Sequence, residues 1–225
     1  MLDREEVLFM SLNKSYAVFG LGRYGTAVAK ELVKNGADVL AVDIDENIVN
    51  SSISDIPLCK CADITDPEVV RHLGIASVDV VVVAMASNLE ASVMAIMLCK
   101  EMGVKTVIAK CAGDMQAKIL LKVGADKVVI PERESGIRLA KNILSSGFVD
   151  VMELSGDVSL VELEIKREWI GKNLIELNLR KKYGINVIAM KKGDEVIIDL
   201  DPTLPLNSDM QLVIIAHTSK IEKLK

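Results

Sequence analysis

The chain has 225 residues, of which 50% are hydrophobic and 26% charged, and its formal net charge is -5 at pH 7. This balance excludes the polar bias of a disordered chain and indicates a folded protein with one large core or two smaller lobes. Because aromatic residues make up only 3% and the charge is acidic, neither a basic stripe nor a stacking surface for nucleic acid is expected.

The first segment, residues 1–13, reads as an N-terminal extension. It begins MLDREE and lacks the basic region of a signal peptide. The longest apolar run of the chain, from Val80 to Ala86, is far short of the roughly 20 residues that cross a bilayer. We therefore expect a cytoplasmic protein.

Short β-branched runs alternate with longer amphipathic stretches from residue 14 onward. They predict strands at 16–20, 39–43, 79–85, 105–110 and 126–130, with a further strand before Asp63 and helices between the strands. Asp66 and Pro67 suit the start of one of these helices. The runs are continuously apolar, as in a parallel sheet covered on both faces. The class is α/β, and residues 14–148 are predicted to form a Rossmann-type, doubly wound parallel sheet.

The pattern changes after a long helix predicted at 131–146, which Pro131 would start and Gly147 would end. Residues 149–225 are predicted to form a small α+β lobe, with the boundary within 146–150. The expected elements are a strand at 158–165, a helix at 172–184, a strand at 186–192, a turn at 192–194 and strands at 195–200 and 211–216.

A glycine motif lies where the first strand turns into the first helix. Gly20 allows the tight turn, Gly22 lets the backbone approach a pyrophosphate, and Gly25 lets helix and strand pack closely. The N–H groups at the start of that helix suit phosphates. The motif predicts a dinucleotide or nucleotide site.

Three charged residues refine this site. Asp43 follows the second strand, where its carboxylate can accept both ribose hydroxyls and disfavours the 2′-phosphate of NADP. Asp63, after the third strand, can reach the adenine side. Arg23 lies inside the loop, where its guanidinium can meet a terminal phosphate, so ATP or ADP fits as well as NAD. The alternative is an Arg23 side chain that points into solvent.

Cysteines and histidines give no catalytic or metal signature. Cys59, Cys61, Cys99 and Cys111 form no C-x-x-C pair, so free buried thiols are expected rather than a metal cage. The two histidines, His72 in a helix and His217 at a strand end, have no carboxylate arrangement that reads as a catalytic pair. We expect no enzyme activity.

Several motifs in order, YAVFGLGRYGTAVAKEL, VLAVDIDENIV, CADITD, VVVVAMASNLEAS and GADKVVIPE, resemble the N-lobe of RCK (regulating conductance of K+) domains. EWIGKNLIELNLRKKYGINVIAMKKG and LVIIAHTSKIEKL are similar to the RCK C-lobe. One lobe of each kind is the arrangement of KtrA/KtrC-type cytosolic potassium-uptake regulators, and the resemblance extends from about residue 14 to 225.

The resemblance implies a regulatory subunit without turnover. RCK dimers would assemble into an octameric ring beneath a KtrB/TrkH-type membrane K+ transporter, at the inner face of the membrane, and ATP and ADP would hold the ring in different shapes. The alternatives from other classes are an NAD-dependent oxidoreductase and a sensor of NAD/NADH redox poise, which needs every nucleotide-site residue except Arg23.

The resemblance also implies site residues. Arg23 would sense a γ-phosphate, Lys110 would face the phosphates, and Glu132 would help a divalent or monovalent cation to bridge two nucleotide sites. Lys110 and Glu132 can instead be a surface lysine and a helix-start acid. Asp45 falls where related proteins often have Asn, which leaves its role open. The full nucleotide set is Gly20, Gly22, Arg23, Tyr24, Gly25, Asp43, Asp45, Asp63, Ser87, Asn88, Lys110 and Glu132.

A second ligand, cyclic di-AMP, is implied in the C-lobe. The matching positions are Leu174, Ile175, Leu177, Arg180 and Asn186, an apolar wall with one arginine and one amide. The alternative is that Leu174 and Leu177 form the buried stripe of a helix.

Overall fold

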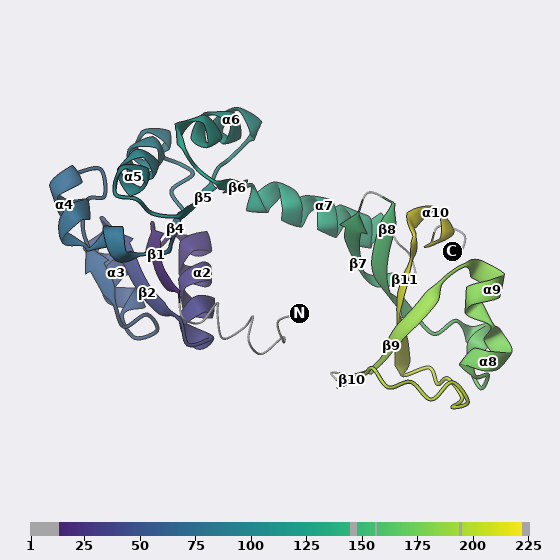
Figure 1. The fold of residues 1–225 in the computed structure, drawn as a ribbon. Helices are drawn as coiled ribbons and strands as arrows, with labels where there is room; N and C mark the ends of the chain where they lie inside the picture. Colours follow the sequence, from purple (N-terminus) through teal and green to yellow (C-terminus); the bar gives the residue numbers. More distant parts are fainter. Residues whose placement is uncertain (1–13, 145–147, 156, 194, 222–225) are drawn as a thin grey trace. The chain divides into compact units, whose positions relative to one another are not determined.

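The computed structural model describes residues 14–144, 148–155, 157–193 and 195–221. The chain divides into two compact units, Met1–Glu132 and Arg133–Lys225, which we describe separately (Figure 1). The predicted extension at 1–13 and the helix end at Gly147 lie outside the described residues. The lobe bounds 14–148 and 149–225 stay a prediction.

The first unit contains a six-stranded parallel sheet of order β3-β2-β1-β4-β5-β6. The order reverses between β1 and β4, which lie side by side at the centre. In open α/β sheets, ligands bind outside the carboxyl ends of the strands at such a reversal. The predicted Rossmann-type sheet is confirmed. Its strands are β1 (Ser15–Phe19), β2 (Asp38–Asp43), β3 (Cys59–Cys61), β4 (Val80–Val83), β5 (Thr106–Lys110) and β6 (Lys127–Val129).

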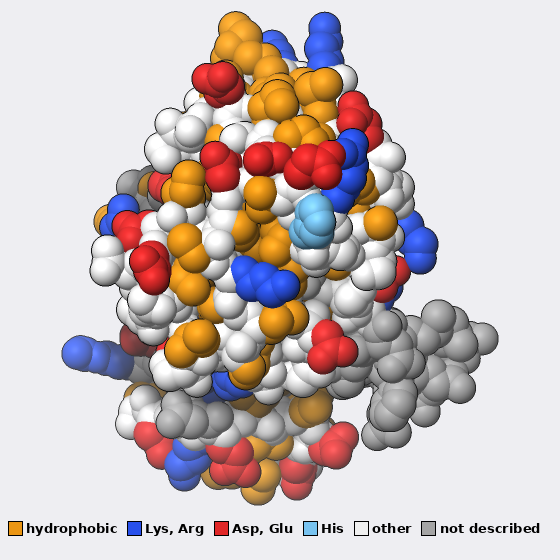
Figure 2. Space-filling model, turned by 90° about the vertical axis from the view of Figure 1, so that its left-hand side faces the viewer, with side chains coloured by type: hydrophobic (Ala, Val, Ile, Leu, Met, Phe, Trp, Pro, Cys, Tyr) orange, Lys and Arg blue, Asp and Glu red, His pale blue; other side chains and the backbone are white. Residues whose placement is uncertain are grey.

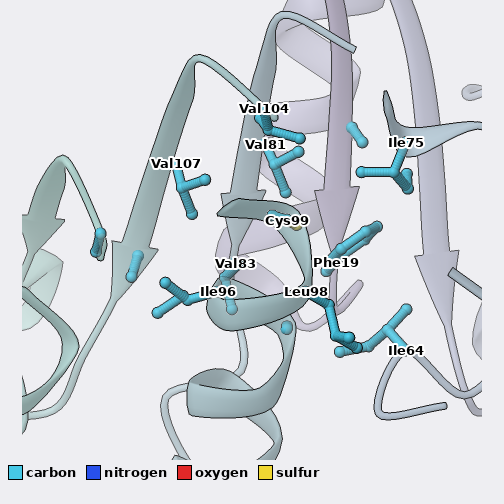
Figure 3. Close-up of a cluster of buried hydrophobic side chains, with 14 of the residues drawn as sticks. Phe19, Ile64, Ile75, Val81, Val83, Ile96, Leu98, Cys99, Val104 and Val107 are labelled. Atoms are coloured by element: carbon cyan, nitrogen blue, oxygen red, sulfur yellow. The ribbon is translucent and has the colours of Figure 1, made fainter. Parts of the chain in front are cut away.

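Helices cover both faces of this sheet, which explains the continuously apolar strands. Successive residues of β1 alternate between two cores: Ala17 and Phe19 belong to one, and Val18 belongs to the other. In the larger core, Phe19 lies among side chains from neighbouring strands and from α5 (Figure 3). The helices are α2 (Arg23–Lys34), α3 (Glu46–Ser52), α4 (Pro67–His72), η1 (Ile75–Ser77), α5 (Leu89–Glu101) and α6 (Asp114–Val123).

The second unit is built on an antiparallel sheet of order β10-β9-β11-β8-β7. Trp169, Leu177 and Leu212 are among the buried residues of its separate core. This confirms the predicted small α+β unit. Helix α7 (Pro131–Leu144) precedes it, and its elements are β7 (Phe148–Ser155), β8 (Val158–Glu164), η2 (Arg167–Trp169), α8 (Leu174–Leu177), α9 (Leu179–Tyr183), β9 (Asn186–Lys192), β10 (Glu195–Ile197), β11 (Met210–His217) and α10 (Thr218–Ile221).

Three details of this unit differ from the prediction. The single helix expected at 172–184 is wrong, because Asn178 has φ 44° and separates α8 from α9. The strand expected at 195–200 ends at Ile197. Strand β7 was not predicted; it pairs antiparallel with β8 at the edge of the sheet. Only this tertiary pairing identifies it as a strand.

Cysteines and histidines also differ in part from expectation. Cys99 and Cys111 are buried, but Cys61 is exposed and Cys59 half-buried on the edge strand β3, so the expectation of buried thiols holds for only two of the four. His217 lies 3.2 Å from a carboxylate, that of Asp157, which the sequence did not indicate. Both side chains are exposed.

The surface shows no dominant charge on the face drawn in Figure 2, where acidic, basic and hydrophobic side chains are interspersed. Within the part of the chain that the structure describes, no helix has the length and apolar character needed to span a bilayer.

Candidate functional site

A cavity of about 330 Å³ opens where β1 to β4 end at their carboxyl edge. It brings together five of the predicted site residues: Gly20, Asp43, Asp63, Ser87 and Asn88. Apolar and small side chains complete the lining, which also includes Val42, Ile44, Ala62, Ile64, Thr65, Met85 and Ala91. A mostly apolar cavity with a few polar groups is the usual form of a small-molecule site.

The three glycines of the motif have separate structural reasons. Gly20 has φ +88°, and a Cβ there would lie 2.6 Å from Cγ of Met85. A Cβ on Gly25 would lie 1.9 Å from the carbonyl oxygen of Gly20, so helix α2 can approach the strand only with glycine at this position. A Cβ on Gly22 would meet nothing within 4 Å. Gly20 and Gly25 therefore serve the fold, while Gly22 leaves backbone open to a ligand.

Helix α2 starts directly from this loop with its amino end uncompensated. Gly22 is the N-cap, and no side chain caps the helix. The first turn contains no acidic residue. The partial positive charge of a helix N-terminus is thus available to an anion, as a phosphate site requires.

The carboxylate of Asp43 fastens the glycine loop to β2. Its Oδ2 accepts a hydrogen bond from the backbone N–H of Leu21 at 2.6 Å. Its Oδ1 accepts one from the backbone N–H of Asp45 at 2.9 Å. A carboxylate has about four lone-pair positions, so acceptor capacity is left for ribose hydroxyls.

Asp45 and Asn88 both cap helices. The Asp45 side chain accepts from the N–H of Asn47 at 2.9 Å and starts α3, and Asp45 does not line the cavity. The Asn88 side chain accepts from the N–H of Ala91 at 3.0 Å and starts α5. Asn88 lines the cavity while it caps its helix.

Asp63 lines the cavity just beyond β3. Its Oδ1 accepts two hydrogen bonds from Thr65, one from the backbone N–H at 2.9 Å and one from the hydroxyl at 2.7 Å. The hydroxyl bond first, and then the backbone bond, lower the pKa of the Asp63 carboxyl. The group is therefore ionised at neutral pH.

A second group of predicted residues gathers around Lys110, outside the cavity lining. The Lys110 ammonium lies 2.7 Å from Oε1 of Glu132 and 5.6 Å from the centre of the Tyr24 ring. The Lys110 hydrogen bond, with a smaller contribution from the charge of Arg23, lowers the pKa of Glu132. Gly22 and Gly25 also lie outside the lining.

The described residues contain no group of three or more His, Cys, Asp or Glu that could hold a metal ion. Glu132 contributes one carboxylate, which is paired with Lys110. A cation at Glu132 would need its other oxygen donors from a bound nucleotide or another subunit.

In the second unit, a cavity of about 280 Å³ brings together three of the five predicted residues: Leu174, Arg180 and Asn186. Leu177 is buried in the core instead, and Ile175 is 61% exposed outside the lining. The other lining residues are Asn178, Leu179, Ile185 and Val187.

Sequence reasoning missed some of the first cavity's lining. Thr65, Ile44 and Met85 were not singled out. Thr65 lies two residues after Asp63, the spacing at which an aspartate side chain commonly bonds the backbone ahead of it. That spacing was the available signal.

Two family models match the chain: the TrkA-N domain at residues 16–131 and the TrkA-C domain at residues 158–225.

Individual proteins and structures agree with these models. "Ktr system potassium uptake protein C" of Bacillus subtilis is 38% identical over 212 residues, which are 94% of this chain and 96% of that protein. "Ktr system potassium uptake protein A" of Vibrio alginolyticus is 35% identical over 214 residues, 95% of this chain and 97% of that protein. The crystal structure of the GsuK RCK domain superimposes with a TM-score of 0.65 at 16% identity, over 94% of this chain and 46% of that chain, and supports the fold.

Proposed function

Because this chain belongs to the family of TrkA-N and TrkA-C domain proteins that includes the Ktr potassium uptake proteins A and C, we propose that it is a nucleotide-sensing regulatory subunit of a potassium uptake system. It binds ATP or ADP and controls a membrane potassium transporter by changing shape. It turns over no substrate.

The observation that carries this proposal is the cavity that joins the glycine loop to Asp43 and Asp63. Gly22 supports phosphate binding, because its backbone faces open space at the uncapped start of α2. Asp43 supports ribose binding, because its carboxylate retains acceptor capacity beside the loop. Asp63 supports adenine binding, because it lines the same cavity just beyond β3. Ser87 and Asn88 complete the polar lining, and Asp45 would act indirectly by capping α3.

The preference for ATP and ADP over NAD rests on charged side chains near the loop. Arg23 is exposed in the first turn of α2, and its charge contributes to lowering the pKa of Glu132. Lys110 is held between Glu132 and Tyr24. These two cationic side chains would respond to the number of phosphates. The difference between the binding free energies of ATP and ADP would set how far the conformational equilibrium can shift. A bound cation at Glu132 would bridge two nucleotide sites.

Assembly into a ring of dimers, an octamer, is part of the proposal. Helix α7 supports it, because its exposed side chains include Ile137, Leu139 and Ile143, which are 50%, 60% and 72% exposed. Large apolar side chains that stay exposed at several positions of one helix suit a contact with another subunit. We place the ring in the cytoplasm, at the inner face of the membrane, beneath a KtrB/TrkH-type subunit.

A second ligand, cyclic di-AMP, is proposed for the second unit. Arg180 and Asn186 line one cavity there with Leu174 as an apolar wall. A guanidinium and an amide beside an apolar wall suit a phosphate and a purine. Ile175, which is exposed, would contact the ligand only at the site of a neighbouring subunit. Leu177, which is buried, would not contact the ligand and would support the cavity by packing in the core.

Calorimetry of the purified chain against ATP, ADP, NAD, NADH and cyclic di-AMP tests the ligands, and light scattering tests the ring. We expect ATP and ADP to bind with different affinities and the particle to have the mass of eight chains. A monomer that binds none of the five ligands contradicts the proposal.

A redox-sensing NAD module is the second candidate, because Asp43 suits the ribose of NAD as well as that of ATP. Arg23→Ala separates the two. Redox sensing is favoured if the variant binds ATP as tightly as the wild type does and if both proteins bind NADH more tightly than ATP. Oxidoreductase activity would appear as NADH formation across a panel of hydroxy acids.

A further inference from the structure

A further cavity of the first unit, which we call the amino-edge cavity, opens where β1 and β2 begin. Its volume is about 380 Å³, which is within the range of small-molecule sites. Ser15 and Asp38, the first residues of β1 and β2, are paired in the sheet and both line this cavity. The proposed nucleotide cavity lies at the carboxyl ends of the same strands. The two cavities can therefore be occupied at the same time.

Most of the lining of the amino-edge cavity is apolar and comes from segments that are far apart in the chain. It includes Val33 of α2, Leu40 of β2, Leu58 just before β3, and Leu73 and Val78 on either side of η1. The Leu58 side chain is 51% exposed. A ligand with an apolar body is favoured here, because its burial removes apolar surface of both molecules from water.

The serine hydroxyls of this lining are already used within the protein. The Ser77 hydroxyl donates to the carbonyl of Gly74 at 2.8 Å. The Ser15 hydroxyl lies 3.1 Å from the carbonyl of Ser77 and 3.3 Å from the carboxylate of Asp79, which are both acceptors. The described residues of the lining include no lysine, arginine or histidine. An anionic ligand would therefore find neither a cationic side chain nor a free serine donor.

The carboxylate of Asp38 is the single charged group among the described lining residues. It is exposed and forms no hydrogen bond or ion pair with another described residue. Helix α2 also ends beside the cavity, and the carbonyl groups at a helix C-terminus carry partial negative charge. Lys34, in the last turn of α2, pairs with Glu31 at 3.7 Å and does not line the cavity. The electrostatics of the lining thus favour a cation.

We propose that the amino-edge cavity binds an organic ammonium ion with an apolar body. Asp38 accepts the ammonium group, and the apolar wall holds the rest of the molecule. Tyr16 also lines the cavity, and an aromatic ring attracts the same kind of cation. The site goes beyond the proposed nucleotide function and does not depend on it.

The test titrates the full chain with 4-phenylbutylamine, its neutral analogue 4-phenylbutanol and its anionic analogue 4-phenylbutyrate, and saturation-transfer NMR of the probes measures binding. The amine is protonated at neutral pH, as a lysine side chain is. We expect it to bind about threefold to fivefold more tightly than the alcohol, because an ion pair with an exposed carboxylate has a modest effect. The carboxylate probe is expected to bind more weakly than the alcohol. Equal affinity for amine and alcohol, or no binding of the amine, overturns the inference.

Asp38→Asn keeps the side-chain shape and removes the charge, so it is expected to lower amine affinity by the same factor and to leave the alcohol unchanged. Asp55→Asn is the matched control, because Asp55 is an exposed acid that pairs with Lys30 at 2.6 Å and does not line the cavity. Equal losses in both variants would indicate general attraction to an acidic surface and would overturn the inference.

Saturating ATP locates the probe and separates the two sites. We expect ATP to leave amine binding unchanged, because the two cavities lie at opposite edges of the sheet. Displacement of the amine by ATP would place the probe in the nucleotide cavity and overturn the inference. A wild type that binds the amine but no nucleotide supports the inference and contradicts the proposed function alone.

Discussion

The ammonium of Lys110, at the end of β5, lies 2.7 Å from the carboxylate of Glu132, in the first turn of α7. The lysine side chain is 16% exposed and the glutamate side chain 69% exposed. A cation that is largely withdrawn from water thus has its charge balanced by an acid at the surface. The pair lies among the residues that we propose to sense phosphates.

Replacing Lys110 by methionine is expected to raise the pKa of Glu132 toward its ordinary value of 4.5, because the Lys110 hydrogen bond, the largest cause of its lowered pKa, is lost. A carboxyl group whose pKa is lower in the folded than in the unfolded protein stabilises the fold at a pH above the unfolded pKa. That stabilisation is lost as the pH falls through the folded pKa. Lys110→Met therefore removes a stability contribution that the wild type keeps above pH 4.5. Carboxyl NMR titration measures the shift.

Lys105→Met is the matched control. Lys105 pairs with Asp79 at 3.0 Å, and this hydrogen bond is the largest cause that lowers the pKa of Asp79. The variant is expected to raise the pKa of Asp79 and leave Glu132 unchanged. If Lys110→Met leaves the titration of Glu132 where it is in the wild type, the ion pair is not present in solution.

Gly22→Ala is expected to reduce ATP affinity, whereas Gly25→Ala is expected to reduce the stability of the fold. At Gly25 the new Cβ meets the Gly20 carbonyl, so the free energy of unfolding falls by about 3 kcal/mol or more. At Gly22 the Cβ meets open space, so the thermal midpoint stays and ATP affinity falls about tenfold or more. Thermal denaturation and calorimetry measure both. A Gly22→Ala variant with wild-type ATP affinity contradicts phosphate binding at this backbone.

Asp43→Asn is expected to reduce nucleotide affinity by about tenfold or more, because hydrogen bonds to a charged carboxylate are stronger than those to an amide. Asp45→Asn is the control, since asparagine is an equally good N-cap for α3. Calorimetry with ATP distinguishes them. Equal losses in both variants would mean that Asp45 contacts the ligand directly.

Thiol labelling of the native protein is expected to modify Cys61 first. Burial raises the pKa of Cys99 to about 12, so almost no reactive thiolate forms at neutral pH. Burial also raises the pKa of Cys59, and Cys111 is buried. Maleimide labelling with mass spectrometry of the peptides measures the order. Labelling of Cys99 as fast as Cys61 would show that the core of the first unit opens readily.

Arg180→Ala is expected to weaken cyclic di-AMP binding about tenfold or more, because a charge-assisted bond to phosphate is lost. Lys181→Ala, the exposed neighbour outside the cavity, is the control. Calorimetry with cyclic di-AMP measures the difference. Loss of binding in both variants alike would indicate nonspecific attraction to a basic helix.

Much of the first unit could be predicted from the sequence because its determinants are local. Strands buried on both faces read as continuous apolar runs, as at Val80–Val83. Asp66 and Pro67 are residue types that favour the start of a helix, so the start of α4 could be predicted from them. In the structure the Asp66 side chain caps α4 and Pro67 is its first residue.

The second unit was less predictable because tertiary contacts decide it. Strand β7 contains Asp150 and Glu153 and is identified by its pairing with β8. Asn178 adopts the left-handed conformation that asparagine tolerates better than most residues, and it divides a helix that the apolar spacing alone would continue.

Within the site, the glycines and Asp43 follow from motif spacing, and the structure places Gly20 and Asp43 at one cavity. The two-residue spacing of Asp63 and Thr65 was a local signal for their bond, whereas the contact of Lys110 with Tyr24 depends on tertiary structure. No spacing rule predicts a contact between a lysine and an aromatic ring so far apart in the chain.

The glycine loop is held by its own hydrogen bonds: Gly20 N–H donates to the Val42 carbonyl at 2.8 Å, and the Thr26 hydroxyl donates to the Leu21 carbonyl at 2.7 Å. A loop ordered in this way loses little conformational entropy when a ligand arrives. Little of the binding energy is then consumed at the loop itself. In the proposed function, the difference in binding free energy between two nucleotides is then available to move the parts of the protein that contact a partner.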